Sequence, residues 1–306
     1  MSVIKTEYNV KSSDNIHTLA GHVYIPDNPG QKIKGMLHVV HGMCEHIERY
    51  DTFMREIAEN GFICFGYDNL GHGRTVNDDE LGYIARREGY ERLAEDVKIY
   101  SDAVRRDFGG DKPYFLMGHS MGSFIVRYAA EKYVLPDKLI IMGTGGKNPA
   151  AGFGIALINA MMLFCGDKHR SKLIYKMVFG SYIKKFPEKE YNSWISKDAD
   201  VRARYRADKY CSFMFTLSAM KDLVVLNHKT NSDKWFNSFN TKLPVLLLSG
   251  GDDPVGDYGK GVTQVYCRLQ KRGCNVQMKL YPGCRHEILN DTSREECIRD
   301  ILSFIK

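Results

Sequence analysis

Short apolar runs alternate with longer amphipathic stretches along most of the chain. The runs span six to eight residues and end at turn residues, which is typical of buried strands. They lie at residues 18–25, 35–41, 62–67, 113–118, 138–143, 244–249 and 275–281. Apolar residues at helical spacing predict helices between most of the runs, at 51–60, 88–107, 121–133, 257–272 and 292–305. Strands that alternate with helices predict an α/β fold with a mostly parallel central sheet, covered by helices on both faces.

One interval interrupts this alternation. About a hundred residues separate the predicted strands at 138–143 and 244–249, which is too long for a loop in a compact domain. We therefore expect residues 1–144 and 241–306 to form the core, and residues 145–240 to form an inserted, mainly helical cap.

A serine between two glycines follows the predicted strand at 113–118. The stretch GHSMG (118–122) places Ser120 between this strand and a predicted helix, which is the context of a nucleophile elbow. The two glycines leave room for the sharp turn and for a close approach of the helix. The five residues alone are also compatible with an ordinary Gly/Ser turn. The predicted strand before them and the predicted helix after them favour the nucleophile.

A serine hydroxyl is a poor nucleophile at neutral pH and needs a base. His286 follows one predicted strand near the C-terminus, and the adjacent Asp252 and Asp253 follow another. The order Ser, Asp, His, each after a strand, is typical of folds that carry the elbow, although each residue alone also suits an ordinary loop. Asp253 lies three residues after Gly250 and is our first choice for the acid, with Asp252 as the fallback.

The loop after an early strand is suited to stabilising an oxyanion. The backbone N–H groups of Met43, in this loop, and of Met121, after the predicted nucleophile, are the expected donors. His41, Cys44 and His46 form an HxxCxH pattern in the same loop, which competes as a metal site. Because no second cluster supplies further ligands, we expect no metal and no cofactor.

Five motifs together resemble the monoacylglycerol lipase and lysophospholipase group of α/β-hydrolases, which is also described as serine aminopeptidase-like. They are HGMCEHIERY (41–50), YDNLGHGRT (67–75), GHSMG (118–122), SGGDDPVG (249–256) and YPGCRHEILND (281–291). The resemblance covers nearly the whole chain except about residues 145–240. It implies the α/β-hydrolase fold. The roles that it implies are nucleophile for Ser120, acid for Asp253, base for His286 and oxyanion donors for Met43 and Met121.

Two further details follow from the resemblance. Asp68, Gly71, His72 and Gly73 match a loop of the family that we interpret as architecture. Cys44 departs from the pattern, because members often have glycine or alanine there, and its larger side chain is expected to narrow the acyl pocket.

The resemblance implies hydrolysis of acyl esters such as monoacylglycerols or lysophospholipids through an acyl-enzyme. An acyltransferase and a catalytically silent binding protein on the same fold stay open as alternatives. A further alternative is an aminopeptidase, in which carboxylates of the cap bind a free amino group. The candidates for that role are Glu188, Glu190, Asp198 and Asp200.

The charge of the chain is concentrated in the expected cap. The chain has 43 basic and 37 acidic side chains, and residues 166–210 hold 12 of the first and 6 of the second, so this segment accounts for the whole surplus of six. The surplus favours a solvated face over an anionic membrane contact. The basic residues are mixed with acidic ones and no recognition motif for nucleic acid appears, so we expect no nucleic-acid partner. The resemblance implies a small acyl ester as the partner. The sequence does not define the oligomeric state.

An apolar stretch from Pro149 to Cys165 opens the expected cap. It predicts a helix shorter than a membrane span. Two interpretations stay open: a lid that guides an acyl chain and transiently touches a membrane surface, or a helix buried against the core. Eight cysteines without CxxC pairs, and an N-terminus without the apolar core of a signal peptide, predict reduced thiols and a cytoplasmic location.

Overall fold

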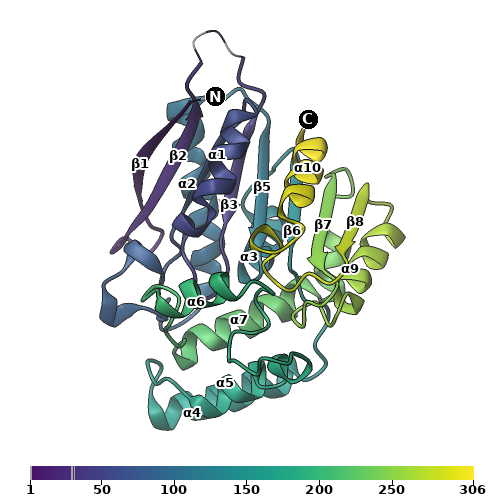
Figure 1. Cartoon of the computed structure of the whole chain (residues 1–306). Coiled ribbons are helices and arrows are strands. Elements are labelled where there is room, and N and C mark those ends of the chain that lie inside the picture. The colour runs from purple at the N-terminus through teal and green to yellow at the C-terminus, as the bar shows by residue number, and fades with distance from the viewer. Residues whose placement is uncertain (1, 29, 31) are drawn as a thin grey trace.

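One eight-stranded sheet dominates the computed structural model, which describes residues 2–28, 30 and 32–306 (Figure 1). The strands are β1 (Val3–Lys11), β2 (Thr18–Pro26), β3 (Met36–Val40), β4 (Ile63–Tyr67), β5 (Tyr114–His119), β6 (Lys138–Met142), β7 (Val245–Gly250) and β8 (Val276–Tyr281). Their order is β1-β2-β4-β3-β5-β6-β7-β8, with β1 and β2 antiparallel and the strands from β4 to β8 parallel. The predicted mostly parallel sheet is confirmed.

Helices cover both faces of this sheet because its central strands are apolar on both sides. All residues of β3, β4, β5 and β7 are buried, as expected for a parallel sheet between two helical layers. One face packs on α1 (Asp51–Glu59) and α10 (Arg294–Ile305). The other packs on α2 (Gly89–Phe108), α3 (Met121–Lys132) and α9 (Lys260–Lys271).

Two predictions from periodicity differ from the structure. Strand β1 was not predicted, because it lies at the sheet edge and buries none of its residues fully, so no apolar run marks it. Helix α9 begins three residues later than expected. Asp257, Tyr258 and Gly259 have φ values of 48°, 55° and 88°, and consecutive positive φ values are incompatible with a right-handed helix.

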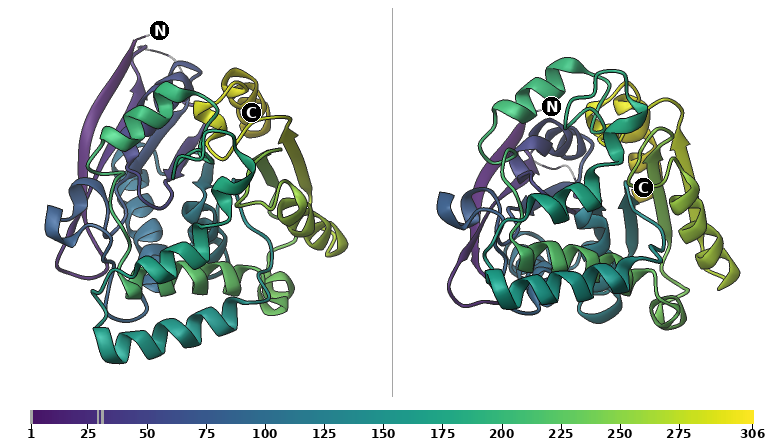
Figure 2. Two further views of the ribbon diagram at one scale, coloured as in Figure 1. Left: turned by 60° about the horizontal axis from the view of Figure 1, so that its bottom comes forward. Right: turned by 90° about the horizontal axis from the view of Figure 1, so that it is seen from below.

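Residues 145–240 contribute the remaining α-helices of the described residues, and most of these lie beyond one end of the sheet (Figure 1). They are α4 (Ala151–Cys165), α5 (Lys172–Phe179), α6 (Ala199–Ala207), α7 (Leu217–Thr230) and α8 (Asp233–Ser238). Figure 1 shows α4 to α7 gathered below the sheet, and the view from below in Figure 2 shows them spread across its end. Helix α7 packs on α2, α3 and α4, so α4 reaches the core through α7.

Helix α4 buries little of its apolar surface. Only Ala151 and Ile158 are buried, whereas Phe153, Leu163 and Phe164 are 69%, 85% and 89% exposed. The interpretation of a helix buried against the core therefore does not describe most of its length. Among the helices of the described residues, none combines the length and apolar character needed to cross a bilayer.

Candidate active site

Ser120 occupies a tight turn between β5 and α3. Its φ of 55° and ψ of −120° are costly for a residue with a side chain, and such strain is found mostly at functional sites. A Cβ at Gly118 would lie 2.2 Å from the carbonyl oxygen of Gly122, and one at Gly122 would lie 2.1 Å from that of Val40. The two glycines therefore permit the sharp turn and the close packing of α3 on β3.

His286 and Asp253 meet at the carboxyl ends of β8 and β7. His286 Nδ1 lies 2.9 Å from Asp253 Oδ2, and both residues are buried, at 2% and 0% exposure. The Ser249 hydroxyl and the Val255 N–H also donate to Asp253, at 3.2 and 2.9 Å. These hydrogen bonds hold the carboxylate against Nδ1, so His286 presents Nε2 as the nitrogen available to act as a base.

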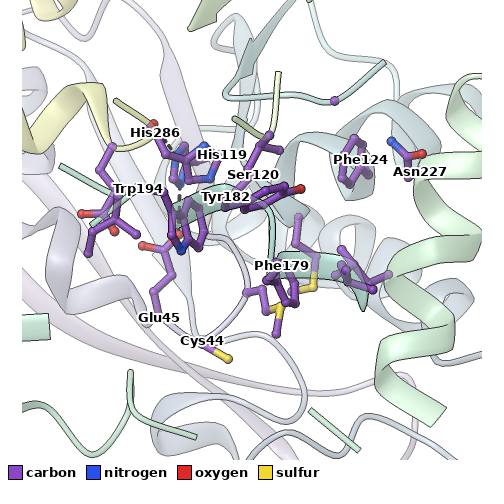
Figure 3. Close-up of a pocket in the computed structure, with 18 of the residues that line it drawn as sticks. Cys44, Glu45, His119, Ser120, Phe124, Phe179, Tyr182, Trp194, Asn227 and His286 are labelled. Carbon is purple, nitrogen blue, oxygen red and sulfur yellow. Dashed lines mark hydrogen bonds and ion pairs between the residues drawn. The ribbon is translucent and has the colours of Figure 1, made fainter. Parts of the chain in front are cut away.

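His286 Nε2 is buried and has no hydrogen-bond partner among the described residues. The ring lies between two others: its centroid is 4.6 Å from that of His119 and 5.0 Å from that of Trp194. Figure 3 shows Ser120, His119 and His286 grouped at one end of the pocket. An unpartnered buried nitrogen beside a strained serine is the arrangement expected of a base and its nucleophile.

The loop after β3 lies directly against the serine turn. A Cβ at Gly42 would lie 2.9 Å from Ser120 Cβ, so only glycine allows this approach. The N–H of Met43 forms no hydrogen bond with the described part of the chain, and the N–H of Met121 is the first of α3, which has no acceptor within its own helix. Two free N–H groups thus flank Ser120.

A buried carboxylate organises this loop. Glu45 Oε1 accepts hydrogen bonds from the N–H of Gly42 at 2.5 Å and the hydroxyl of Tyr50 at 3.0 Å, and lies 3.1 Å from His119 Nδ1. Burial disfavours a charged Glu45, but the hydrogen bond and the charge of His119 outweigh it and hold the pKa of Glu45 below its usual range. Burial likewise opposes a charged His119, but Glu45 outweighs it and raises the pKa of His119.

Arg49 balances the remaining charge near the pocket. Its guanidinium donates to Glu45 at 3.0 Å and forms a bidentate pair with Glu287, with both distances at 2.7 Å. The neighbouring charges raise the pKa of Arg49 although burial opposes this. Glu45 and Glu287, the two glutamates that line the pocket, are therefore already neutralised by protein groups.

The HxxCxH residues do not converge. His41 Nδ1 lies 2.8 Å from the carbonyl oxygen of Gly42, and Nε2 accepts from the N–H of Asn69 at 2.9 Å, so neither nitrogen is free for a metal. Burial lowers the pKa of His41 to about 3. Cys44 donates to the carbonyl oxygen of Phe213 at 3.2 Å.

Cys44 lines the pocket with an unusual backbone. Its φ is 52°, a conformation that favours glycine and gives a physical reason for the small residues of the family pattern. Cys44 is among the residues that line the pocket, and the narrowing of the pocket by its side chain stays a prediction.

The site opens into a cavity of about 190 Å³. The loop after β3, the serine turn, α7 and other segments of residues 145–240 all contribute to its lining (Figure 3). Its aromatic side chains from the cap are Tyr175, Phe179, Tyr182, Trp194 and Tyr205. On the α7 side, Phe124, Leu223 and Val224 make an apolar wall. The lining therefore combines an apolar wall with polar groups, Glu45 and Tyr205 among them.

Other residues singled out from the sequence lie outside this cavity. Asp252 is only partly buried, and His286 Nδ1 pairs with Asp253 instead. Asp68 accepts from the N–H groups of Ile47 and Arg74, at 2.7 and 2.8 Å, and so braces the loop after β3 from behind.

The four cap carboxylates considered for amine binding do not line the cavity. Glu188 pairs with Arg285 at 3.0 Å, and Glu190 pairs with Arg202 at 3.1 Å. Asp198 caps α6, and Asp200 is exposed in its first turn.

Local sequence patterns gave no role to Glu45, His119, Tyr50 or the aromatic lining residues of 145–240. Glu45 and Arg49 stand within the quoted motif HGMCEHIERY, four residues apart, a spacing that suits an ion pair on a helical turn. The aromatic residues carry no pattern that marks them as lining, because their role depends on how the cap folds over the core.

Known proteins resemble the chain over nearly its whole length. A model of the family described as "Serine aminopeptidase, S33" matches residues 31–293. A monoacylglycerol lipase from Mycolicibacterium smegmatis is 23% identical, over 97% of this chain and 98% of its own length. A monoglyceride lipase homolog from Monkeypox virus is 25% identical over 89% of each chain.

Among solved structures, a thermostable carboxyl esterase from Bacillus coagulans in complex with glycerol is 30% identical. The match covers 98% of this chain and 97% of that one, with a TM-score of 0.91. The resemblance seen in the motifs is therefore confirmed, together with the α/β-hydrolase fold.

Proposed function

This chain belongs to the serine aminopeptidase S33 family of α/β-hydrolases and is a hydrolase that acts on esters, and we propose that its substrates are monoacylglycerols or lysophospholipids. The observation that carries the proposal is the position of Ser120. It lies beside His286 and two free N–H groups, in the wall of a cavity that has both apolar and polar lining residues.

In the proposed mechanism, Ser120 Oγ attacks the ester carbonyl carbon while its proton passes to His286 Nε2. Asp253 stabilises the resulting imidazolium through Nδ1. The N–H groups of Met43 and Met121 donate to the oxyanion of the tetrahedral intermediate. The alcohol then leaves with the proton from His286, and water hydrolyses the acyl-enzyme by the same steps.

The apolar and the polar parts of the lining suit the acyl chain and the alcohol of such an ester. The apolar wall of Phe124, Leu223 and Val224 suits an acyl chain, because burial of each CH₂ contributes about 0.8 kcal/mol. The part of the lining near Glu45 and Tyr205 offers polar groups to a small alcohol.

Peptide hydrolysis is the activity that the family description suggests as an alternative. An aminopeptidase needs an unpaired carboxylate to bind the substrate ammonium group. Glu45 and Glu287 face the cavity but are paired with Arg49, and the four cap carboxylates lie elsewhere. This arrangement disfavours a substrate whose ammonium group must be bound by an unpaired carboxylate.

We also propose that α4 contacts a membrane surface transiently. Its exposed Phe153, Leu163 and Phe164 form an apolar surface, and exposed lysines follow in the next segment. Lys168 and Lys172 are examples. Exposed apolar side chains beside lysines suit an anionic lipid surface. The location of the protein in the cytoplasm stays a prediction from its free thiols.

The first test is a p-nitrophenyl ester series from acetate to palmitate, with monoacylglycerol, lysophospholipid and an aminoacyl anilide alongside, for the wild type and Ser120→Ala. We expect activity on longer acyl chains that disappears in the variant. Equal rates in both proteins would remove Ser120 from the mechanism, and activity on the anilide alone would establish a peptidase. Transfer of the acyl group to added glycerol, faster than hydrolysis, would instead establish an acyltransferase.

A further inference from the structure

Three metal-binding side chains meet between the loop after β3 and the segment after α6. His46, Asp208 and Cys211 each present a donor atom, and these atoms lie within 4.8 Å of one another. His46 comes from the core loop, and the other two residues come from a turn of the cap segment. We propose that His46, Asp208 and Cys211 bind a divalent cation of the zinc class.

The donor geometry requires little rearrangement. Zinc binds nitrogen and oxygen at about 2.0–2.2 Å and sulfur at about 2.3 Å, so tetrahedral donors around one ion lie roughly 3–4 Å apart. His46 Nε2 and Asp208 Oδ2 are 2.8 Å apart and hydrogen-bonded. A bound ion replaces this hydrogen bond and separates the two atoms by a few tenths of an ångström, roughly the tetrahedral spacing.

The chemistry of the donors selects the cation. A thiolate, an imidazole and one carboxylate favour zinc-class ions over magnesium and calcium, which prefer all-oxygen sites. On binding, the thiol proton of Cys211 passes to solvent, and its sulfur bonds the ion beside neutral His46 and ionised Asp208. Water takes the fourth position, since three protein ligands and one open position are common in zinc sites.

Further hydrogen bonds and a ring contact already orient these three side chains. The other oxygen of Asp208, Oδ1, accepts from the N–H of Tyr210 at 2.8 Å, and the Tyr210 ring packs edge-on against His46 at 5.7 Å. The N–H of Cys211 donates to the carbonyl oxygen of Asp208 at 3.0 Å, which closes the turn and brings both side chains to one side. Such supporting contacts strengthen metal binding.

The site has a path from solvent and a balanced charge. The side chains of His46 and Asp208 are 12% and 31% exposed, whereas Cys211 is 2% exposed. Arg49 is the cation whose charge acts on Cys211, and its own charge is paired with Glu45 and Glu287. An incoming cation therefore does not meet an uncompensated positive charge.

Occupancy links the cap segment to the loop that supplies an oxyanion donor. His46 lies three residues after Met43, and Asp208 and Cys211 follow α6. A bound ion therefore restrains the motion of this part of the cap and is expected to slow turnover. This consequence rests on the proposed function, whereas the binding itself does not.

The binding is tested with full-length protein stripped of metal. Titration with zinc in competition with a chromophoric chelator is expected to give one bound equivalent. Cobalt is expected to give a thiolate-to-metal charge-transfer band. Cys211→Ser and His46→Gln are each expected to weaken zinc binding at least ~10-fold, and Cys211→Ser also removes the band. Cys274→Ser is the matched control, because Cys274 is another buried free thiol.

Two outcomes would overturn the site: no stoichiometric zinc binding by the wild type, or undiminished binding by a Cys211→Ser variant whose melting temperature matches the wild type. Zinc is also expected to slow ester hydrolysis by the wild type and to leave Cys211→Ser unaffected. If zinc binds as expected and the rate of ester hydrolysis does not change, the predicted restraint on the cap is wrong, whereas the metal site itself is supported. If no variant hydrolyses esters, the proposed function fails independently of the zinc titration.

Discussion

Asp252 and Asp253 are adjacent in the chain and differ completely in their surroundings. Asp253 is fully buried and contacts His286, whereas Asp252 is partly exposed. We expect Asp253→Asn to lower kcat by ~10³–10⁴-fold, because the amide no longer holds the imidazole in the productive tautomer. Asp252→Asn is the matched control and is expected to keep the kcat of the wild type. A p-nitrophenyl ester assay measures both, and equal losses would reassign the acid.

Glu45 is expected to act by positioning the loop that carries Met43. Glu45→Gln weakens the hydrogen bond to Gly42 and removes the charge that stabilises protonated His119. We expect kcat to fall ~10-fold or more, as when an oxyanion donor is displaced, with little change in KM. The pKa of His119, followed by NMR, is expected to fall. Exposed Glu295 supplies the control Glu295→Gln, and an unchanged His119 titration in Glu45→Gln would contradict this account.

At the scale of elements, two glycines in two helices are expected to respond oppositely to alanine. A Cβ at Gly122 in α3 would lie 2.1 Å from the carbonyl oxygen of Val40, whereas one at Gly152 in α4 meets nothing within 4 Å. Gly122→Ala is expected to destabilise the fold by ~1–3 kcal/mol through overpacking. Gly152→Ala is expected to stabilise it by up to ~1 kcal/mol. Thermal unfolding distinguishes them, and a stable Gly122→Ala would show that α3 can shift away from β3.

Helix α4 provides the test of the membrane contact. We expect the double variant Leu163→Ser and Phe164→Ser to bind anionic vesicles more weakly than the wild type, because it removes two of the most exposed apolar side chains. Hydrolysis of a water-soluble acetate ester is expected to stay the same. Leu135→Ser is the matched control, since Leu135 is 80% exposed but lies outside the cap. Equal loss of vesicle binding in the control would remove α4 as the contact.

At the scale of the whole molecule, a buried carboxyl is expected to make stability depend on pH. Asp222 of α7 is 3% exposed where α7 meets the start of α2. Burial raises its pKa to about 7, although the N–H groups of Tyr90 and Gly89 oppose this. A folded pKa above the unfolded value stabilises the fold below about pH 4, and this contribution is lost as the pH rises through 7.

Asp222→Asn is therefore expected to flatten the fall in melting temperature between pH 5 and 8. At pH 8 the variant is expected to be more stable than the wild type by roughly 1–3 kcal/mol, because it buries no charge at this position. Burial also raises the pKa of Asp96, to about 6. This carboxyl is therefore expected to leave a smaller pH dependence of the melting temperature in the variant. An identical pH dependence in both proteins would contradict the assignment to Asp222.

The parallel strands and their flanking helices were predicted nearly to the residue, because burial on both faces leaves long apolar runs. The strand predicted at 244–249 is found at Val245–Gly250, and the helix at 121–133 is found at Met121–Lys132. Edge strand β1 was missed because it has no fully buried face. Of the helices of residues 145–240, only the apolar α4 was predicted, since the others mix polar and apolar positions.

The sequence by itself determined the α/β fold, the order of the candidate serine, aspartate pair and histidine and the loops that carry them, because each follows directly from a local pattern. Tertiary structure alone decided that Asp253, not Asp252, contacts His286 and that Glu45 braces the loop of Met43 through Gly42. It also decided which cap side chains line the cavity and that His46 meets Cys211 instead of Cys44. Except for Glu45 with Gly42, these contacts join residues far apart in the chain, so their distances depend on how whole elements pack and no local spacing records them.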